Sequence, residues 1–171
     1  MSIKAVPTLA GIYLSPAKGE PMQSVESVLA IASEGLEGDR YQKKQGAWTK
    51  IRAETAVRDV SIISMEGFER VRAIMGAEFG PELTRRNLVL RGISPEDLSD
   101  LLNKEFQIGS VKMRGAEPCD PCGRPSKLSG IPGYEKVGLL GGLRARILNT
   151  ARMQVGDVVG PLGIEPRTKR L

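Results

Sequence analysis

The chain has 171 residues, of which 40% are hydrophobic and 26% are charged, so it is long enough for one globular domain with a hydrophobic core. It contains no histidine, which excludes Ser-His and Cys-His catalytic pairs and histidine-containing zinc sites, and its two cysteines are too few for a four-thiolate metal site. The net charge of +5 is typical either of a protein with an anionic partner or of a basic surface without one.

The N-terminal part of the chain predicts strands separated by glycine-rich loops. Residues that favour β-structure predict strands over Val6–Leu14 and Ser24–Ile31. The glycines of Gly35–Arg40 predict a loop, and the polar segment Tyr41–Lys50 predicts irregular backbone. A further short strand is expected over Glu54–Val60.

Two helices are predicted in the middle of the chain. Apolar residues spaced by three and four predict an amphipathic helix over Ser61–Met75, which Gly76 ends. A short buried strand is expected at Leu88–Leu90. Ser94 and Pro95 then have the character of an N-cap and a first helical residue, so they predict the start of the second helix.

The C-terminal part predicts mostly strands. Alternating apolar residues over Glu105–Arg114 predict a strand pair that turns at Gly109-Ser110, and Ala145–Leu148 and Val155–Val159 predict the last strands. Six to eight short strands and two or three helices, without regular β-α alternation, argue against a Rossmann fold. We therefore expect a mainly β fold, as a barrel or strongly bent sheet with peripheral helices, and a single domain over residues 1–171.

The location expected for the protein is the cytoplasm. No apolar run is long enough to span a bilayer, and the first residues lack the hydrophobic region of a signal peptide. We therefore expect a reducing environment and no membrane partner. A permanent disulfide between the two cysteines is not expected there.

Both cysteines lie in one short segment, Cys119-Asp120-Pro121-Cys122. The surrounding run Glu117–Pro125 is rich in proline and glycine, which predicts a loop. Two thiols in one loop indicate a site, because structural cysteines are usually scattered and buried. The alternative is a pair of inert thiols.

Five segments, in order along the chain, resemble the MOSC domain, the C-terminal domain of molybdenum-cofactor sulfurases that also occurs as small stand-alone bacterial proteins. They are Gly35–Arg40, Thr84–Gly92, Pro121-Cys122, Gly142–Ala145 and Gly156-Asp157. The resemblance covers about residues 5–160 and leaves residues 161–171 as a C-terminal tail. It implies a MOSC-type β-barrel and a site for the molybdenum cofactor, a pterin with a dithiolene and a phosphate.

The resemblance also implies that a cysteine late in the domain is the functional residue. Cys122, preceded by Pro121, matches that position better than Cys119. In this family such a cysteine binds molybdenum or carries sulfur as a persulfide, and a soft thiolate suits both roles. Cys119 is expected either to resolve an oxidised or persulfidated Cys122 or to be a bystander.

Basic residues at positions that match cofactor contacts in relatives are the second element of the expected site. These are Arg40 and Arg85, with Lys18 and Arg86 as further candidates, and Arg124 lies next to the cysteines. Arginine suits a phosphate because its planar fork binds two oxygens at once. The alternative for Arg85 and Arg86 is a solvated pair on the surface.

Other residues of the matching segments are expected to be structural. Asp39 either orients an arginine or caps a turn, and Asn87 is expected to bond to the backbone at the start of a strand. The glycines of these segments, which include Gly142 and Gly156, are expected in turns or in close packing.

Three functions remain open at this stage. The first is a protein that binds molybdenum cofactor and reduces N-hydroxylated compounds, with an electron-donor protein as partner. The second is a sulfur carrier that takes persulfide sulfur from a cysteine desulfurase; no pyridoxal-phosphate lysine motif is evident in the chain. The third is a nucleic-acid or interaction domain, against which the aromatic content of 4% argues. The sequence leaves a monomer and a homodimer equally open.

Overall fold

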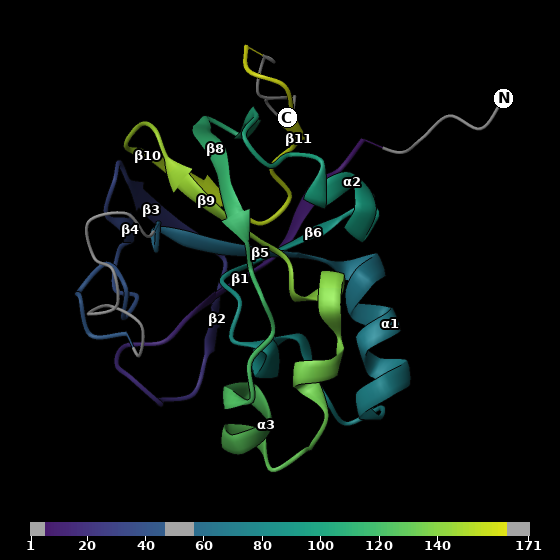
Figure 1. Ribbon diagram of the computed structural model, residues 1–171. Coiled ribbons are helices and arrows are strands. Elements are labelled where there is room, and N and C mark those ends of the chain that lie inside the picture. Colours follow the sequence, from purple (N-terminus) through teal and green to yellow (C-terminus); the bar gives the residue numbers. More distant parts are fainter. Residues whose placement is uncertain (1–5, 47–56, 164–171) are drawn as a thin grey trace, which may run out of the picture.

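The computed structural model describes residues 6–46 and 57–163, and most of these residues lie in strands or in the turns between them (Figure 1). The helices within these ranges are short. They are α1 (Met65–Met75), α2 (Pro95–Ser99) and α3 (Arg124–Ser129), with the 3-10 helices η1 (Pro81–Thr84), η2 (Tyr134–Lys136) and η3 (Gly138–Gly141). None of the described helices is long and apolar enough to cross a membrane.

One large sheet forms most of the fold. Its strand order is β11-β7-β8-β9-β5-β6-β1-β2, and β5 and β6 are parallel whereas the other described pairs are antiparallel. The strands are β1 (Thr8–Leu14), β2 (Gln23–Val25), β5 (Val60–Ser64), β6 (Leu88–Arg91), β7 (Glu105–Ile108), β8 (Val111–Pro118), β9 (Leu143–Ile147) and β11 (Val159–Gly160). A second sheet has the order β10-β3-β4 and consists of β3 (Ser27–Ile31), β4 (Gly35–Leu36) and β10 (Ala151–Gln154).

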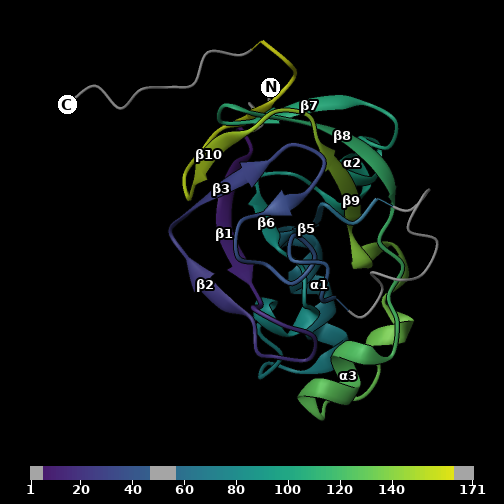
Figure 2. The same ribbon diagram turned by 90° about the vertical axis from the view of Figure 1, so that its left-hand side faces the viewer.

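Backbone hydrogen bonds close the large sheet by joining β1, the strand next to β2 at one end, to the segment before β11 at the other end. Thr8 and Val158 form an antiparallel bridge, the Leu9 N–H donates to the Asp157 carbonyl at 2.8 Å, and the Gly156 N–H donates to the Leu9 carbonyl at 2.8 Å. These bonds connect β1 with the segment that leads into β11. The sheet therefore curls around a common interior, as the side view in Figure 2 shows.

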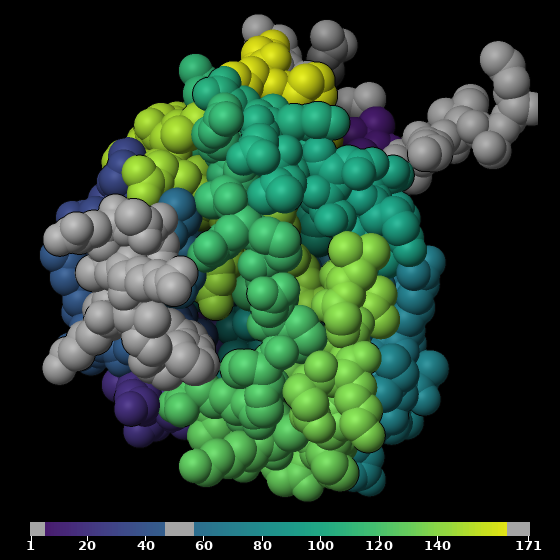
Figure 3. Space-filling model, viewed as in Figure 1, coloured from purple at the N-terminus to yellow at the C-terminus, as the bar shows by residue number. Residues whose placement is uncertain are grey.

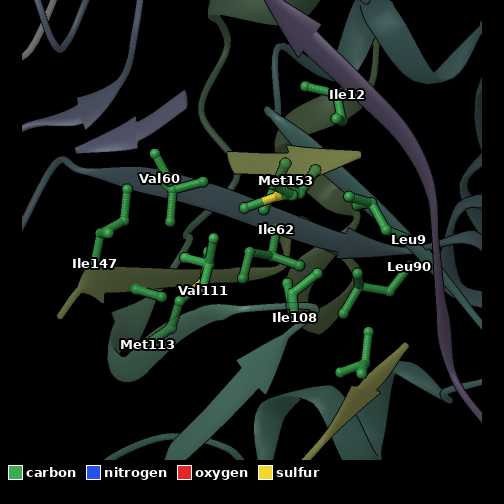
Figure 4. Packing of buried hydrophobic residues seen from close by; sticks show 14 of the residues in the cluster. Leu9, Ile12, Val60, Ile62, Leu90, Ile108, Val111, Met113, Ile147 and Met153 are labelled. Carbon is green, nitrogen blue, oxygen red and sulfur yellow. The ribbon is translucent and has the colours of Figure 1, made fainter. Parts of the chain in front are cut away.

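Two clusters of buried side chains fill the fold. The larger one occupies the interior of the curled sheet, where Ile62, Ile108, Val111 and Met153 point toward one another (Figure 4). The smaller cluster lies between the sheet and α1 and includes Ile63, Phe68, Val71, Phe79 and Tyr134. Because Ile62 and Ile63 face opposite clusters, β5 is buried on both faces.

That double burial explains one error in the predicted elements. We expected Ser61–Met75 to be a helix, but Ser61–Ser64 belong to β5 and α1 begins at Met65. A strand buried on both faces has consecutive apolar residues, which a local pattern does not separate from a buried helix. Ser64 is the N-cap instead, since its hydroxyl accepts the Gly67 N–H at 3.1 Å. Gly76 ends α1 as predicted.

The remaining differences are at strand boundaries. The expected strand Ser24–Ile31 is divided at Glu26, because β2 pairs with β1 whereas β3 pairs with β10. The expected strand Val155–Val159 is mostly a turn between β10 and β11. Part of the expected strand Glu54–Val60, and the end of Tyr41–Lys50, lie outside the described residues. Eleven strands are described in place of six to eight, since several are only two or three residues long.

The predicted loop Gly35–Arg40 begins with the two residues of β4, whereas the other predicted elements are confirmed. The strand at the N-terminus, the strand at Leu88–Leu90, the helix start at Ser94-Pro95 and the strand pair through Gly109-Ser110 are all present, and Ala145–Leu148 overlaps β9. The fold class is confirmed too: a mainly β, curled sheet with three short helices.

Gly142 provides a test of this packing. Its φ is +100°, and an added Cβ would collide with the carbonyl oxygen of Ile62 in β5. We expect Gly142→Ala to lower the free energy of unfolding by about 3 kcal/mol, measured by urea denaturation. Gly130→Ala is the matched control, because Gly130 also has positive φ (+77°) but no atom within 4 Å of the added Cβ. Its expected cost is about 1 kcal/mol, and equal losses for both variants would contradict the packing described.

Candidate functional site

An open pocket lies where the loops after β1 and β4 meet the segment between β8 and α3. It encloses about 430 Å³, including its mouth. In Figure 3 the surface is hollowed beside the green segment that contains residues 118–125. We call it the arginine pocket, because five of the ten described residues that line it are arginines and none is a carboxylate. The lining consists of Gly19, Arg40, Tyr41, Ser61, Arg85, Arg86, Cys122, Arg124, Pro125 and Arg144.

Asp39 fixes the loop that carries Arg40. The buried Asp39 carboxylate accepts the N–H groups of Ser15 at 3.0 Å and Tyr41 at 3.2 Å, and it pairs with Arg40 Nη1 at 3.1 Å. Arg40 Nη2 donates to the Arg85 carbonyl at 3.2 Å, and its guanidinium lies 4.7 Å from the centre of the Tyr41 ring. Asp39 therefore orients Arg40, which is one of the structural roles expected for it.

Arg85 is held without an acidic partner among the described residues. It has a left-handed backbone conformation, with φ of +63°, and its Nη1 donates to the Glu20 carbonyl at 2.7 Å. Burial and the neighbouring cations Arg40 and Arg124 lower the pKa of Arg85 to about 10, so it is still charged at neutral pH. Arg40 and Arg124 thus repel Arg85, which favours the binding of an anion between them.

We call residues 119–123, between β8 and α3, the cysteine loop. Arg86 also lines the arginine pocket, but its hydrogen bonds hold this loop. Its Nε donates to the Gly141 carbonyl at 2.8 Å, and its Nη2 lies 3.4 Å from the Cys119 carbonyl and 3.5 Å from that of Asp120. Burial lowers the pKa of Arg86, but the combined electrostatic influence of Cys119, Tyr134, Cys122 and Tyr41 raises it overall, so the guanidinium is charged. Arg85 and Arg86 are both buried, which differs from the solvated pair considered as an alternative.

The two cysteines have unequal environments. Cys119 is only 1% exposed, and its N–H donates to the Gly142 carbonyl at 2.8 Å. Cys122 is partly exposed and lines the arginine pocket, and both thiols are free. The predicted loop is shorter than Glu117–Pro125, because Glu117 and Pro118 end β8 whereas Arg124 and Pro125 begin α3.

The structure brings together most of the basic residues that the sequence singled out. Arg124, the first residue of α3, lines the arginine pocket with Arg40, Arg85 and Arg86. Lys18 is exposed and is not among the lining residues, although its neighbour Gly19 is. Lys127, also near the cysteines, is likewise exposed and outside the lining.

Three lining residues were missed by the sequence analysis: Arg144, Tyr41 and Ser61. Arg144 lies in β9 and its Nε is 3.9 Å from a carboxylate oxygen of Glu117. It belongs to the matching segment Gly142–Ala145. Successive side chains of a strand point to opposite faces, so the apolar neighbours Leu143 and Ala145 were the available signal that Arg144 points away from the core. The Ser61 hydroxyl donates to Asn87 Oδ1 at 3.2 Å. The Asn87 side chain also accepts the Ser61 N–H at 3.2 Å and donates to the Tyr13 carbonyl at 3.1 Å, so it bonds to the backbone as expected.

A second opening adjoins the arginine pocket at Cys122. We call it the side opening, and its lining is Arg58, Arg86, Glu117, Pro118, Asp120, Cys122 and Arg144. Arg58 Nη1 pairs with Glu117 at 2.6 Å. Cys122 therefore lies between a cationic pocket and an opening that contains both signs of charge. No group of three or more His, Cys, Asp or Glu side chains that could hold a metal ion occurs in the described part of the chain.

A family model supports the resemblance found in the sequence. The model described as MOSC domain matches residues 51–160, which include β5 through β11 and both cysteines. The comparison with curated proteins found no match.

Solved structures support the same fold. The YuaD protein from Bacillus subtilis is 18% identical, with a TM-score of 0.71 and coverage of 93% of this chain and 97% of that one. YiiM from Geobacillus stearothermophilus is 13% identical, with a TM-score of 0.64 and coverage of 94% and 79%. YiiM from Escherichia coli is 13% identical, with a TM-score of 0.63 and coverage of 91% and 70%. At these identities the likeness is one of fold.

The role given to Arg86 predicts a difference in thiol reactivity. In the native protein we expect Cys122 to react with a thiol reagent at least about tenfold faster than the buried Cys119. Arg86→Lys should make Cys119 reactive as well, because an ammonium lacks the planar fork that spans three carbonyls. Stopped-flow absorbance with Cys119→Ser and Cys122→Ser would assign the two phases.

Arg144→Lys is the control for this measurement, since Arg144 lines the same pocket without a hydrogen bond to the cysteine loop in the described structure. Its thiol kinetics should match those of the wild type. Unchanged protection of Cys119 in Arg86→Lys would show that Arg86 does not hold the loop.

Proposed function

Because the chain belongs to the MOSC domain family, we propose that it binds the molybdenum cofactor in the arginine pocket and reduces N-hydroxylated compounds. The observation that carries this proposal is the lining of the pocket: one accessible thiol and five arginines, without a carboxylate among the described residues. The arginines attract an anion, and the thiol can bind a metal that accepts soft ligands. The pocket therefore suits an anionic molecule that contains such a metal.

The residues fit the chemical groups of the cofactor. Cys122 would hold the molybdenum, because a thiolate is a soft ligand and the dithiolene supplies the other sulfur atoms. Arg40, Arg85, Arg124 and Arg144 would hold the phosphate, which guanidinium groups bind with two parallel hydrogen bonds. When bound, the cofactor supplies a metal that exchanges electrons with the substrate.

Each neighbouring residue has a separate task in this proposal. Arg86 holds the backbone of the cysteine loop, so that Cys122 faces the pocket. Asp39 orients Arg40. The side opening gives the substrate a separate access to Cys122, and its carboxyl groups, Glu117 and Asp120, can transfer protons from solvent.

The reaction requires a partner. Conversion of an N–OH group to N–H consumes two electrons and two protons and releases one water molecule. The protons come from solvent by way of the side opening. We assign the electrons to a separate electron-donor protein.

Metal content tests the proposal. Protein co-expressed with cofactor synthesis should contain close to one molybdenum atom per chain, measured by plasma mass spectrometry. Cys122→Ser should lower that content at least about tenfold, because it removes the proposed protein ligand. Cys119→Ser is the matched control and should retain the metal, since Cys119 does not line the pocket. Wild-type protein without molybdenum, or equal content in both variants, would contradict the proposal.

The exposure of Cys122 favours a second candidate, a sulfur carrier. Cys122 lines both the arginine pocket and the side opening, so a partner can reach its sulfur. The Cys122 thiolate would attack the outer sulfur of a cysteine desulfurase persulfide, which forms the Cys122 persulfide and releases the desulfurase thiolate.

Mass spectrometry separates the two candidates. After incubation with a desulfurase and cysteine, a sulfur carrier should gain one sulfur atom on Cys122, which Cys122→Ser abolishes and Cys119→Ser retains. Protein that gains sulfur in this way but never retains molybdenum is a carrier. If no adduct forms on Cys122, the carrier role is wrong.

A further inference from the structure

A second hollow opens beside the arginine pocket and differs from it in chemistry. We call it the apolar groove. Its apolar walls are Pro21 and Met22 from the loop between β1 and β2, Leu83 from η1, and Pro125 and Leu128 from α3. It encloses about 510 Å³, including its mouth. Leu128 is 43% exposed, although it is a leucine on the wall of a hollow.

The apolar groove is continuous with the arginine pocket. Gly19, Arg85 and Pro125 line both hollows. Met22 forms a further connection, since its Sδ accepts a hydrogen bond from Arg40 Nη1 at 3.4 Å. A ligand that occupies both hollows would pass directly from guanidinium groups to apolar walls.

The positions of the three openings relative to Cys122 indicate which part of a ligand the apolar groove would bind. Cys122 lines the arginine pocket and the side opening, but it does not line the apolar groove. The groove meets the arginine pocket at Arg85, where Arg40 and Arg124 are the neighbouring cations. It therefore accepts a group attached to the anion held by these arginines, on the side away from Cys122.

We propose that the apolar groove binds the flat, apolar group of an organic phosphate ester whose phosphate lies among the arginines. This inference rests on the proposed function only in placing a phosphate in the arginine pocket. The groove then determines which phosphate esters the chain binds.

Glu82 adds selectivity for a nucleobase. Glu82 lines the apolar groove, and its carboxylate makes no hydrogen bond or ion pair with the described residues. A carboxylate accepts hydrogen bonds from N–H groups on the edge of a base. A nucleoside monophosphate with an amino group on its base should therefore bind at least as tightly as an ester with a plain ring.

Ligand titration tests the proposal on the purified chain without the metal. The probes are inorganic phosphate, phenyl phosphate and cytidine monophosphate, measured by calorimetry at constant ionic strength. Both esters should bind about tenfold more tightly than inorganic phosphate, which corresponds to the burial of about 60 Å² of ring surface. Leu128→Ser should remove most of this advantage and leave the affinity for inorganic phosphate unchanged.

Leu139→Ser is the matched control, because Leu139 is also an exposed leucine (52%) but does not line the groove. It should leave all three affinities unchanged. The proposal is wrong if the esters bind no more tightly than inorganic phosphate, or if Leu128→Ser and Leu139→Ser have the same effect.

The ester titration and the molybdenum measurement can fail independently of each other. Molybdenum content depends on Cys122, whereas the preference for esters depends on Leu128. A chain that retains molybdenum but shows no ester preference would overturn the groove alone. A chain that prefers esters but never retains molybdenum would support the groove and contradict the metal site.

Discussion

Repulsion of the buried Arg85 by its neighbours Arg40 and Arg124 is the constraint on which the site depends. Arg40 pairs with Asp39, but Arg85 and Arg86 are held by backbone carbonyls, which do not cancel their charge. Burial makes each uncancelled charge costly, because the protein interior screens it less than water does. The surrounding loops must therefore be fixed by the rest of the fold, and an anion bound in the arginine pocket would stabilise them.

The curled sheet supplies that support. Arg85 and Arg86 come just before β6, the strand parallel to β5, and Asn87 joins the two strands through Ser61. From this buried position Arg86 reaches the carbonyls of the cysteine loop, so the placement of Cys122 depends on the centre of the sheet. The same arginine thus connects the packing of the core with the chemistry of the site.

Much of the fold could be predicted from local pattern, but long-range pairing could not. The strand pair through Gly109-Ser110 and the helix start at Ser94 follow from nearby residues, and both are present. The change of sheet at Glu26 and the strand character of Ser61–Ser64 depend on β10, β6 and β9, which lie far away in the sequence. Within the candidate site, the charges and the cysteine pair were evident. The different tasks of Arg85 and Arg86 were not, because only the fold determines where adjacent side chains point.

Anomalous diffraction at the molybdenum absorption edge tests the central claim most directly. Crystals of the chain purified from a cofactor-producing host would locate the metal without assumptions about its ligands. The account predicts one peak in the arginine pocket next to the sulfur of Cys122, with the phosphate of the cofactor among Arg40, Arg85 and Arg124. A peak at Cys119, or one outside the arginine pocket, would contradict it.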